Sequence, residues 1–283
     1  MLDIEMMKSL VKRAVQAVFP RTWITIEAAR SRAHSHRLIE RWGIRALNTR
    51  LLDAAGAKVL SGPFLGLELP AMAQAEHIGP FLLGTYEAEL HPWLDSLRHV
   101  PFTQVVDVGA KFGFYAVGLA RLHPEADVVA VDPDPWAQRA TRQMATQNGT
   151  ANVRVVSLCD PAWLTKHLRP GALIISDCEG YEAYLFAEGA VGTLASATLL
   201  IELHEGAQPG VTQALVERFG RTHTVERVKS LDVPVFSTML LEGFSPEEMQ
   251  QASREIRQEQ EWMLLRPRPL GDSKIATPST IVT

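Results

Sequence analysis

A short segment near the middle of the chain combines an acid and two glycines between apolar residues. It reads Val105-Val106-Asp107-Val108-Gly109-Ala110-Lys111-Phe112-Gly113, and apolar residues at helical spacing follow as far as Ala120. This pattern predicts a buried strand, a tight turn and a helix. Glycine in such a turn lets a ligand approach the backbone, and an acid at the carboxyl end of a strand lies where α/β sheets bind ligands. We therefore predict a ligand site at Asp107, Gly109, Ala110 and Gly113.

The spacing of the glycines narrows the class of ligand. A dinucleotide fingerprint reads Gly-x-Gly-x-x-Gly, and its middle glycine admits the pyrophosphate. Here Ala110 takes that position, and the Asp107 carboxylate would repel a pyrophosphate but could accept a hydrogen bond from a cationic amino-acid group. A nucleoside that carries an amino acid, such as S-adenosylmethionine, fits this description. An NAD(P)-dependent oxidoreductase is the alternative, because a strand, a glycine turn and a helix also open such enzymes.

The segment resembles motif I of class I S-adenosylmethionine-dependent methyltransferases, and further segments extend the resemblance to the FkbM-like family. These are Leu83-Gly84-Thr85-Tyr86-Glu87, Ala130-Val131-Asp132-Pro133-Asp134-Pro135, Ser176-Asp177-Cys178-Glu179-Gly180-Tyr181-Glu182 and Ile201-Glu202-Leu203-His204. The resemblance implies an α/β, Rossmann-like fold with a seven-stranded, mostly parallel sheet and helices on both faces. It also implies O-methylation of a hydroxyl on a sugar or another small metabolite. Lys111 departs from the asparagine usual in the family, which leaves a catalytically silent interaction protein as a second alternative.

Two acids follow the next predicted strands, the first of which covers residues 127–131. Asp132 comes about 20 residues after Gly113, the spacing expected for an acid that binds a ribose diol, and Pro133 stands beside it. A cap on the following helix is the competing explanation for Asp132. The resemblance makes Asp160, after a strand over residues 153–158, a candidate partner of the adenine amino group. A solvated loop acid is the alternative there.

The segment 82–94 contains acids at the start of a predicted helix. Thr85 is its predicted cap, and Glu87 lies in the first turn, where the helix dipole favours negative charge. The resemblance places this segment beside the cofactor, so that Tyr86 or, preferably, Glu87 becomes a candidate contact.

Three acids crowd the end of the strand predicted over residues 172–176. Asp177, Glu179 and Glu182 would repel one another unless cations or hydrogen bonds compensate them. They could orient an acceptor hydroxyl, bind the methionine ammonium of the cofactor or hold a divalent ion. Alternatively, these acids lie at the start of a helix, whose dipole favours negative charge. This explanation accounts for Glu182 better than for Asp177.

A histidine follows the strand predicted over residues 198–203. With an ordinary pKa near ~6.5, His204 could accept a proton at neutral pH, and we predict it as the catalytic base, with Asp177 and Glu179 beside it. No metal ligand is assigned. Asp177, Glu202 and His204 nevertheless offer mixed oxygen and nitrogen ligands, which leaves a metal-assisted reaction open.

The length of the chain predicts one large domain with an appendage. A chain of 283 residues buries a self-sufficient core. We expect an N-terminal appendage over residues 1–79, with helices, including one over residues 4–18, and short strands over residues 57–69, a methyltransferase domain over 80–267 and a flexible tail over 268–283.

Composition excludes several classes of partner. The formal net charge of −4 argues against general nucleic-acid binding. Two cysteines provide neither a disulfide framework nor a metal-ligand set, and no run reaches the ~18 apolar residues of a membrane span. Charges recur through the first 13 residues, unlike a signal peptide. We expect a cytoplasmic protein that acts on a small-molecule acceptor, and a homodimer is left open.

Overall fold

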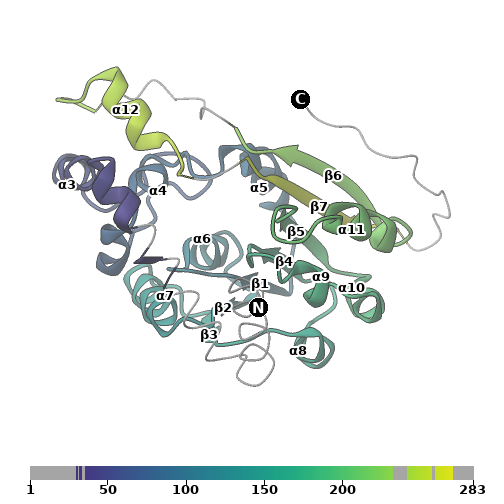
Figure 1. The fold of residues 1–283 in the computed structure, drawn as a ribbon. Helices are drawn as coiled ribbons and strands as arrows, with labels where there is room; N and C mark the ends of the chain where they lie inside the picture. Colours follow the sequence, from purple (N-terminus) through teal and green to yellow (C-terminus); the bar gives the residue numbers. More distant parts are fainter. Residues whose placement is uncertain (1–29, 31, 34–35, 232–240, 257–258, 270–283) are drawn as a thin grey trace, which may run out of the picture.

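The fold is built around one seven-stranded sheet (Figure 1). The computed structural model describes residues 30, 32–33, 36–231, 241–256 and 259–269, so a helix expected over residues 4–18 and most of the expected tail lie outside the described residues. The strands are β1 Gln104–Val108, β2 Asp127–Val131, β3 Val153–Val156, β4 Leu173–Ser176, β5 Thr198–Leu203, β6 His223–Lys229 and β7 Glu261–Pro267.

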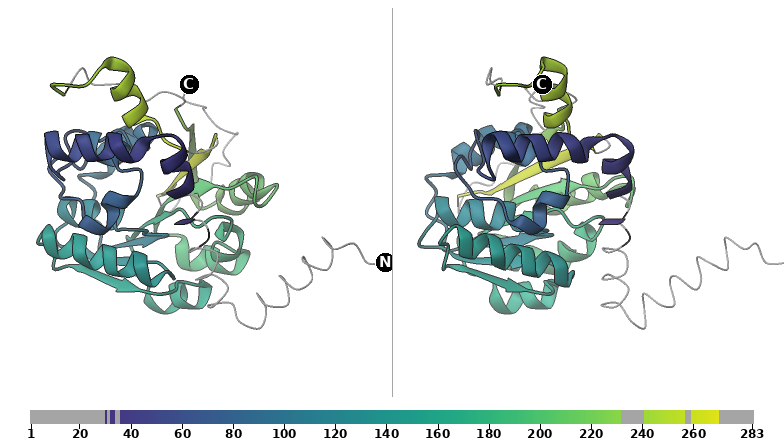
Figure 2. Two further views of the ribbon diagram at one scale, coloured as in Figure 1. Left: turned by 60° about the vertical axis from the view of Figure 1, so that its left-hand side comes forward. Right: turned by 90° about the vertical axis from the view of Figure 1, so that its left-hand side faces the viewer.

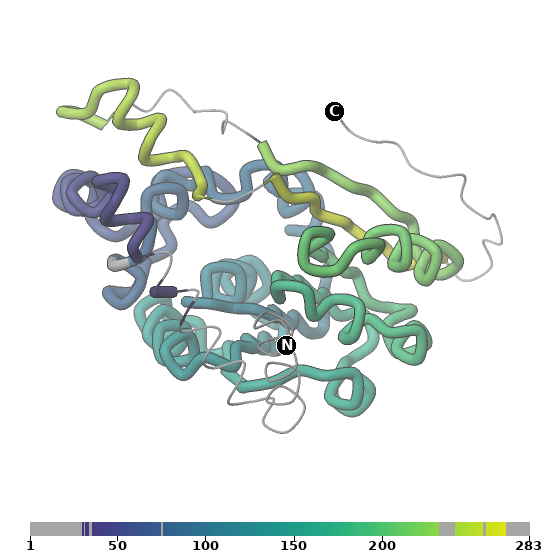
Figure 3. The backbone as a smooth tube through the Cα atoms, viewed as in Figure 1, coloured from purple at the N-terminus to yellow at the C-terminus, as the bar shows by residue number. Residues whose placement is uncertain are grey.

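The order of the strands is β3-β2-β1-β4-β5-β7-β6. The first five strands of this order pair in parallel, and β7 runs antiparallel to both β5 and β6. Figure 3 shows β6 and β7 side by side at one edge of the sheet. The predicted seven-stranded, mostly parallel sheet is confirmed.

Helices cover both faces of the sheet, and this explains why its strands are almost wholly apolar. Neighbouring residues of a strand point to opposite faces. Val128 and Ala130 accordingly belong to one apolar cluster with residues of α6 and α7, whereas Val129 and Val131 belong to a second cluster with residues of α8 and α11. The helices on the first face, which Figure 2 shows from two sides, include α3 Ile44–Ala55, α6 Phe114–Leu122, α7 Pro135–Gln147 and α12 Pro246–Ser253. Those on the second are α8 Pro161–His167, α9 Glu182–Leu185, α10 Val191–Leu194 and α11 Val211–Phe219.

The segment expected to form one helix over 82–94 is instead divided. The structure has α4 Gly79–Leu83, a 3-10 turn η2 Ala88–Leu90 and α5 His91–Leu97. Gly84 ends α4 in the left-handed conformation (φ 72°), a common way to stop a helix. The expected Thr85 cap is wrong, because its hydroxyl donates to the carbonyl of Ser253 at 3.3 Å. The strands expected over 57–69 reduce to a single bridge between Lys58 and Glu68.

The described part of the chain contains no helix with the length and apolar character needed to cross a membrane.

One continuous apolar cluster joins Leu47 and Leu51 of α3 to Leu200 of β5 and Trp262 of β7. The boundary at residue 79 stays a prediction.

Candidate functional site

The carboxyl ends of the parallel strands bring the predicted site residues to one edge of the sheet. Asp107 lies near the end of β1, Asp132 directly follows β2, Asp177 follows β4 and His204 follows β5. These strands are consecutive in the sheet order β2-β1-β4-β5. Parallel sheets bind their ligands at this edge, so the fold places these four residues where a site is expected.

The glycines of the turn between β1 and α6 are required by the protein itself. A Cβ on Gly109, whose φ is 91°, would lie 1.7 Å from the backbone oxygen of Asp177. A Cβ on Gly113 (φ 89°) would lie 2.8 Å from the Thr141 side chain. Close packing of neighbouring backbone and side chains thus requires both glycines, and the approach of a ligand to them stays a prediction. The N–H groups of Gly109 and Ala110 both donate to the carbonyl of Val131, at 2.9 and 3.0 Å.

Asp107 lies buried under this turn. One of its oxygens accepts a hydrogen bond from the N–H of Ala116, 2.9 Å away in the first turn of α6. Burial raises the pKa of Asp107 to about 8; the Ala116 N–H opposes this, and the charges of Asp132 and Asp177 add to it. The carboxylate therefore supports the helix start, and its contact with a cationic group of a ligand stays a prediction.

Asp132 joins two turns of the site. Its Oδ2 accepts from the N–H of Lys111 at 2.9 Å, and its Oδ1 accepts from the N–H of Asp134 at 2.8 Å. Burial raises the pKa of Asp132 to about 7 despite the Lys111 hydrogen bond. The helix cap considered as its alternative role belongs to Asp134, which accepts from the N–H of Trp136 at 2.9 Å. Pro133 is half-buried between the two acids.

Asp160 has a structural partner at the end of β3. It precedes α8 as its N-cap residue, and its Oδ1 accepts from the N–H of Trp163 at 2.7 Å. Such a cap is typically worth ~1 kcal/mol. The contact of Asp160 with adenine stays a prediction.

Glu87 is buried beside the helix that follows the glycine turn. Its carboxylate accepts from the Tyr115 hydroxyl of α6, and its N–H donates to Glu255 at 2.9 Å. Its backbone is left-handed (φ 47°), so it stands outside a helical first turn. The sequence did not indicate these two partners, because Tyr115 lies 28 residues and Glu255 168 residues from Glu87 along the chain. The adjacent Tyr86 ring stacks on Phe81.

The imidazole of His204 lies among four carboxylates. Its Nδ1 is 2.6 Å from Glu182 Oε1. Its Nε2 faces Asp177 Oδ1 at 3.5 Å, Glu202 Oε2 at 3.5 Å and Glu179 Oε2 at 3.6 Å. The structure thus assembles the three residues predicted to be catalytic. It also gives Glu182, expected only as a helix-start acid, a direct role in holding the histidine.

The ordinary pKa assumed for His204 is wrong. Burial disfavours the imidazolium, but the hydrogen bond with Glu182 and the charges of Asp177 and Glu179 outweigh burial and raise the pKa. A raised pKa leaves less neutral imidazole at pH 7, which makes His204 a poorer proton acceptor than the sequence suggested.

Lys111 occupies a left-handed backbone position (φ 49°) in the turn between β1 and α6. Asparagine tolerates this conformation better than lysine. We expect Lys111→Asn to raise the free energy of unfolding by ~0.5–1 kcal/mol, measured by urea denaturation. Lys166→Asn, in the last turn of α8, is the control and should not stabilise the protein. Equal or lower stability of Lys111→Asn would contradict the explanation.

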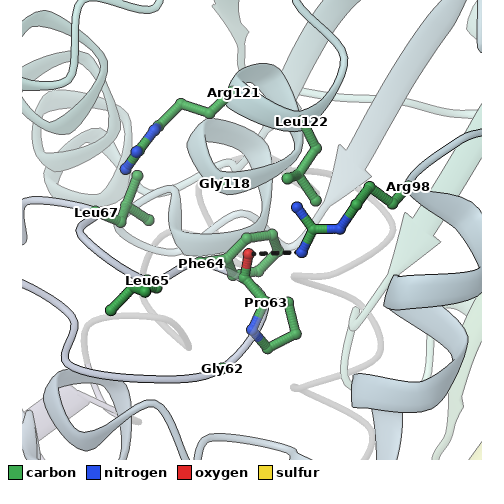
Figure 4. Close-up of a pocket in the computed structure, with 9 residues that line it drawn as sticks. All are labelled: Gly62, Pro63, Phe64, Leu65, Leu67, Arg98, Gly118, Arg121 and Leu122. Atoms are coloured by element: carbon green, nitrogen blue, oxygen red, sulfur yellow. Dashed lines mark hydrogen bonds between the residues drawn. The ribbon is translucent and has the colours of Figure 1, made fainter.

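A cavity of ≈ 320 Å³ lies elsewhere, at the far end of α6 (Figure 4). It is lined by the Gly62–Leu67 turn, by Leu122 and by the side chains of Arg98 and Arg121. Because α6 starts at the edge that carries Asp107 and runs away from it, this cavity lies toward the opposite edge of the sheet and is separate from the acid cluster.

No protein-family model matches the sequence. No curated protein matches it either. Among solved structures, the METTL16 methyltransferase domain is 13% identical, with 79% of each chain covered and a TM-score of 0.45. An rRNA methylase from Streptococcus thermophilus is 16% identical over 63% of this chain and 96% of that chain, with a TM-score of 0.43. The precorrin-6y C5,15-methyltransferase from Geobacter metallireducens GS-15 is 13% identical over 60% and 83%, with a TM-score of 0.43. Similarity at this level concerns general architecture, so the chemistry is argued from the residues of this chain.

Proposed function

We propose that this chain is an S-adenosylmethionine-dependent methyltransferase that methylates a hydroxyl of a sugar or another small metabolite. The observation that carries the proposal is the position of Asp132. Its carboxylate holds the β1–α6 turn through the N–H of Lys111 and the β2–α7 turn through the N–H of Asp134. A nucleoside ribose in this cradle would contact both turns at once.

The hydrogen-bonding capacity of Asp132 is consistent with a ribose diol. An ionised carboxylate has about four acceptor positions, and the two backbone N–H groups occupy one on each oxygen. The remaining positions can accept from the 2′- and 3′-hydroxyls.

The acid-rich environment favours a cofactor with cationic groups. The carboxyl groups of Asp107, Asp132 and Asp177 lie close together: the charge of Asp177 adds to burial in raising the pKa of the other two, and a cation bound beside them would favour their ionised forms. This arrangement suits the ammonium and sulfonium of S-adenosylmethionine better than the pyrophosphate of a dinucleotide, and Ala110 fills the position where a dinucleotide fingerprint requires glycine.

A hydroxyl acceptor requires loss of a proton during transfer. The oxygen forms a bond to the methyl carbon while the S–CH3 bond breaks, and S-adenosylhomocysteine leaves. We assign Asp177, Glu179 and His204 to this step, since Nε2 of His204 lies 3.5 Å from Asp177 Oδ1 and 3.6 Å from Glu179 Oε2. Holding the two reactants in line can contribute ~7–11 kcal/mol to lowering the barrier, so positioning carries most of the expected catalysis.

The test is isothermal titration calorimetry with S-adenosylhomocysteine. We expect the wild-type protein to bind it and Asp132→Ala to bind at least about tenfold more weakly, because hydrogen bonds to a charged group are worth ~1.5–3 kcal/mol. Asp127→Ala is the matched control: Asp127 begins the same strand at the opposite edge and pairs with Arg154 and Arg169. Its affinity should equal that of the wild type.

Two outcomes would refute the proposal. Equal affinities of Asp132→Ala and wild type would remove the ribose from this cradle. Tight binding of reduced nicotinamide dinucleotide, followed by fluorescence, without binding of S-adenosylhomocysteine would favour the oxidoreductase.

A further inference from the structure

The two ring nitrogens of His204 have different environments. Nδ1 is 2.6 Å from Glu182, whose side chain is fully buried. Glu182 Oε1 also accepts from the N–H of Gly180 at 3.3 Å and from the Cys178 thiol at 3.5 Å. Because a carboxylate held in this way is an acceptor, Nδ1 carries a hydrogen. Nε2 is then the nitrogen that remains to bind a metal ion, which displaces any proton that Nε2 carries.

Nε2 of His204 faces one unsatisfied oxygen atom, Oδ1 of Asp177. Nε2 of His204 and Oδ1 of Asp177 are both buried and have no hydrogen-bond partner within the described ranges of the chain. The His204 side chain is only 7% exposed. A buried polar atom without a partner is costly, so two such atoms that face each other at 3.5 Å indicate a missing occupant.

We propose that Asp177, Glu179 and His204 bind a divalent metal cation. One ligand atom from each residue lies within 4.8 Å of the others, and the Nε2 distances of 3.5 and 3.6 Å fit two atoms that share a metal. Two ligands each ~2.1 Å from an ion are ~3.0–3.6 Å apart at angles of 90–120°. Glu202 Oε2 also lies 3.5 Å from Nε2, but it is not one of the three residues that group together.

The surrounding residues match a metal site in two further ways. A metal-bound histidine usually donates its other N–H to a carboxylate, which fixes its tautomer, and Glu182 provides that acceptor. The carboxylates of Asp177 and Glu179 also lie near the same nitrogen, and a cation between them would reduce the repulsion between the two negative charges. One imidazole with carboxylates suits an ion such as Mn²⁺.

The role of this ion rests on the proposed function. A cation beside the acceptor hydroxyl would lower the pKa of that hydroxyl, and the released proton would pass to water as the oxygen takes the methyl group. His204 would then act as a metal ligand, which agrees better with its crowded Nε2 than the role of a free base.

The test uses the full chain and Mn²⁺ alone, because loss of the free Mn²⁺ electron paramagnetic resonance signal measures binding directly. We expect the wild type to bind one equivalent. Asp177→Asn and His204→Gln should weaken binding by more than the ~10- to 100-fold typical for loss of a supporting residue. Glu182 is a positioning residue, so the loss of Mn²⁺ affinity in Glu182→Gln should fall within that range. Glu179→Gln should also bind more weakly, and its side chain is 83% exposed, so folding should be unaffected. Asp127→Asn is the control.

Absence of Mn²⁺ binding by the wild type would overturn the site. Binding retained by Asp177→Asn, His204→Gln and Glu179→Gln would overturn it as well, since the ion would then occupy other surface carboxylates. Titration of the same metal-free protein with S-adenosylhomocysteine separates the two proposals: intact cofactor binding without Mn²⁺ binding defeats only the metal site, and the reverse defeats only the cofactor site.

Discussion

Replacing Gly109 by alanine should destabilise the protein by ~2–5 kcal/mol. A Cβ at this position would lie 1.7 Å from the backbone oxygen of Asp177, so β4 must move away from the turn. The left-handed backbone alone costs an L-residue ~1–2 kcal/mol, and forced overpacking typically costs ~1–3 kcal/mol more. Urea denaturation followed by circular dichroism measures the loss.

Gly149→Ala provides the matched control. Gly149 is also left-handed (φ 66°), but no atom lies within 4 Å of an added Cβ. This variant should therefore lose only the backbone contribution of ~1–2 kcal/mol. If the two variants lose equal stability, the contact with Asp177 does not explain the glycine.

The Asp107→Asn variant should be more stable than the wild type at pH 8 and gain less at pH 5. The pKa of Asp107 is raised to about 8, so between its unfolded pKa near ~3.9 and that value the folded state holds a proton that the unfolded state has lost. The contribution of this group to the free energy of unfolding of the wild type is therefore greatest at low pH. It falls by ~1.4 kcal/mol per pH unit as the pH rises. Asparagine lacks this titration and can still accept from the Ala116 N–H.

The measurement is the free energy of unfolding in urea at several pH values from 5 to 8. The slope for Asp107→Asn should be shallower than that of the wild type by about one proton. Asp127→Asn should leave the slope unchanged over this range, because the pKa of Asp127 is lowered: burial is outweighed by hydrogen bonds from Arg154 and Gln104 and by the charges of Arg154 and Arg169. Parallel curves for Asp107→Asn and wild type would show that Asp107 is charged in the folded protein.

Asp177 connects the Gly109 turn to His204 and the acids around it. The backbone of Asp177 packs against Gly109, and its N–H donates to the carbonyl of Val108 at 2.9 Å. The side chain of the same residue faces His204. The position of β4 therefore links the glycine turn to the acid cluster, and Gly109→Ala should also weaken Mn²⁺ binding if the cluster is a metal site.

The sequence alone determined the sheet and the edge on which its acids lie. Apolar runs that are buried on both faces mark parallel strands clearly, and β2 and β5 have the predicted bounds of Asp127–Val131 and Thr198–Leu203. Once strand ends are known, parallel topology requires residues such as Asp132 and His204 to share one edge, because each strand ends on the same side.

Only the tertiary structure decided what these residues contact. The partner of His204 is Glu182, 22 residues away, and that of Glu87 is Tyr115, 28 residues away. No local pattern encodes such pairs, because they depend on how adjacent strands and loops pack. The pKa values of Asp107 and His204 likewise depend on burial and on charges brought together by folding. The sequence therefore predicted which residues share one edge of the sheet, and the packing of the strand ends decided what those residues contact.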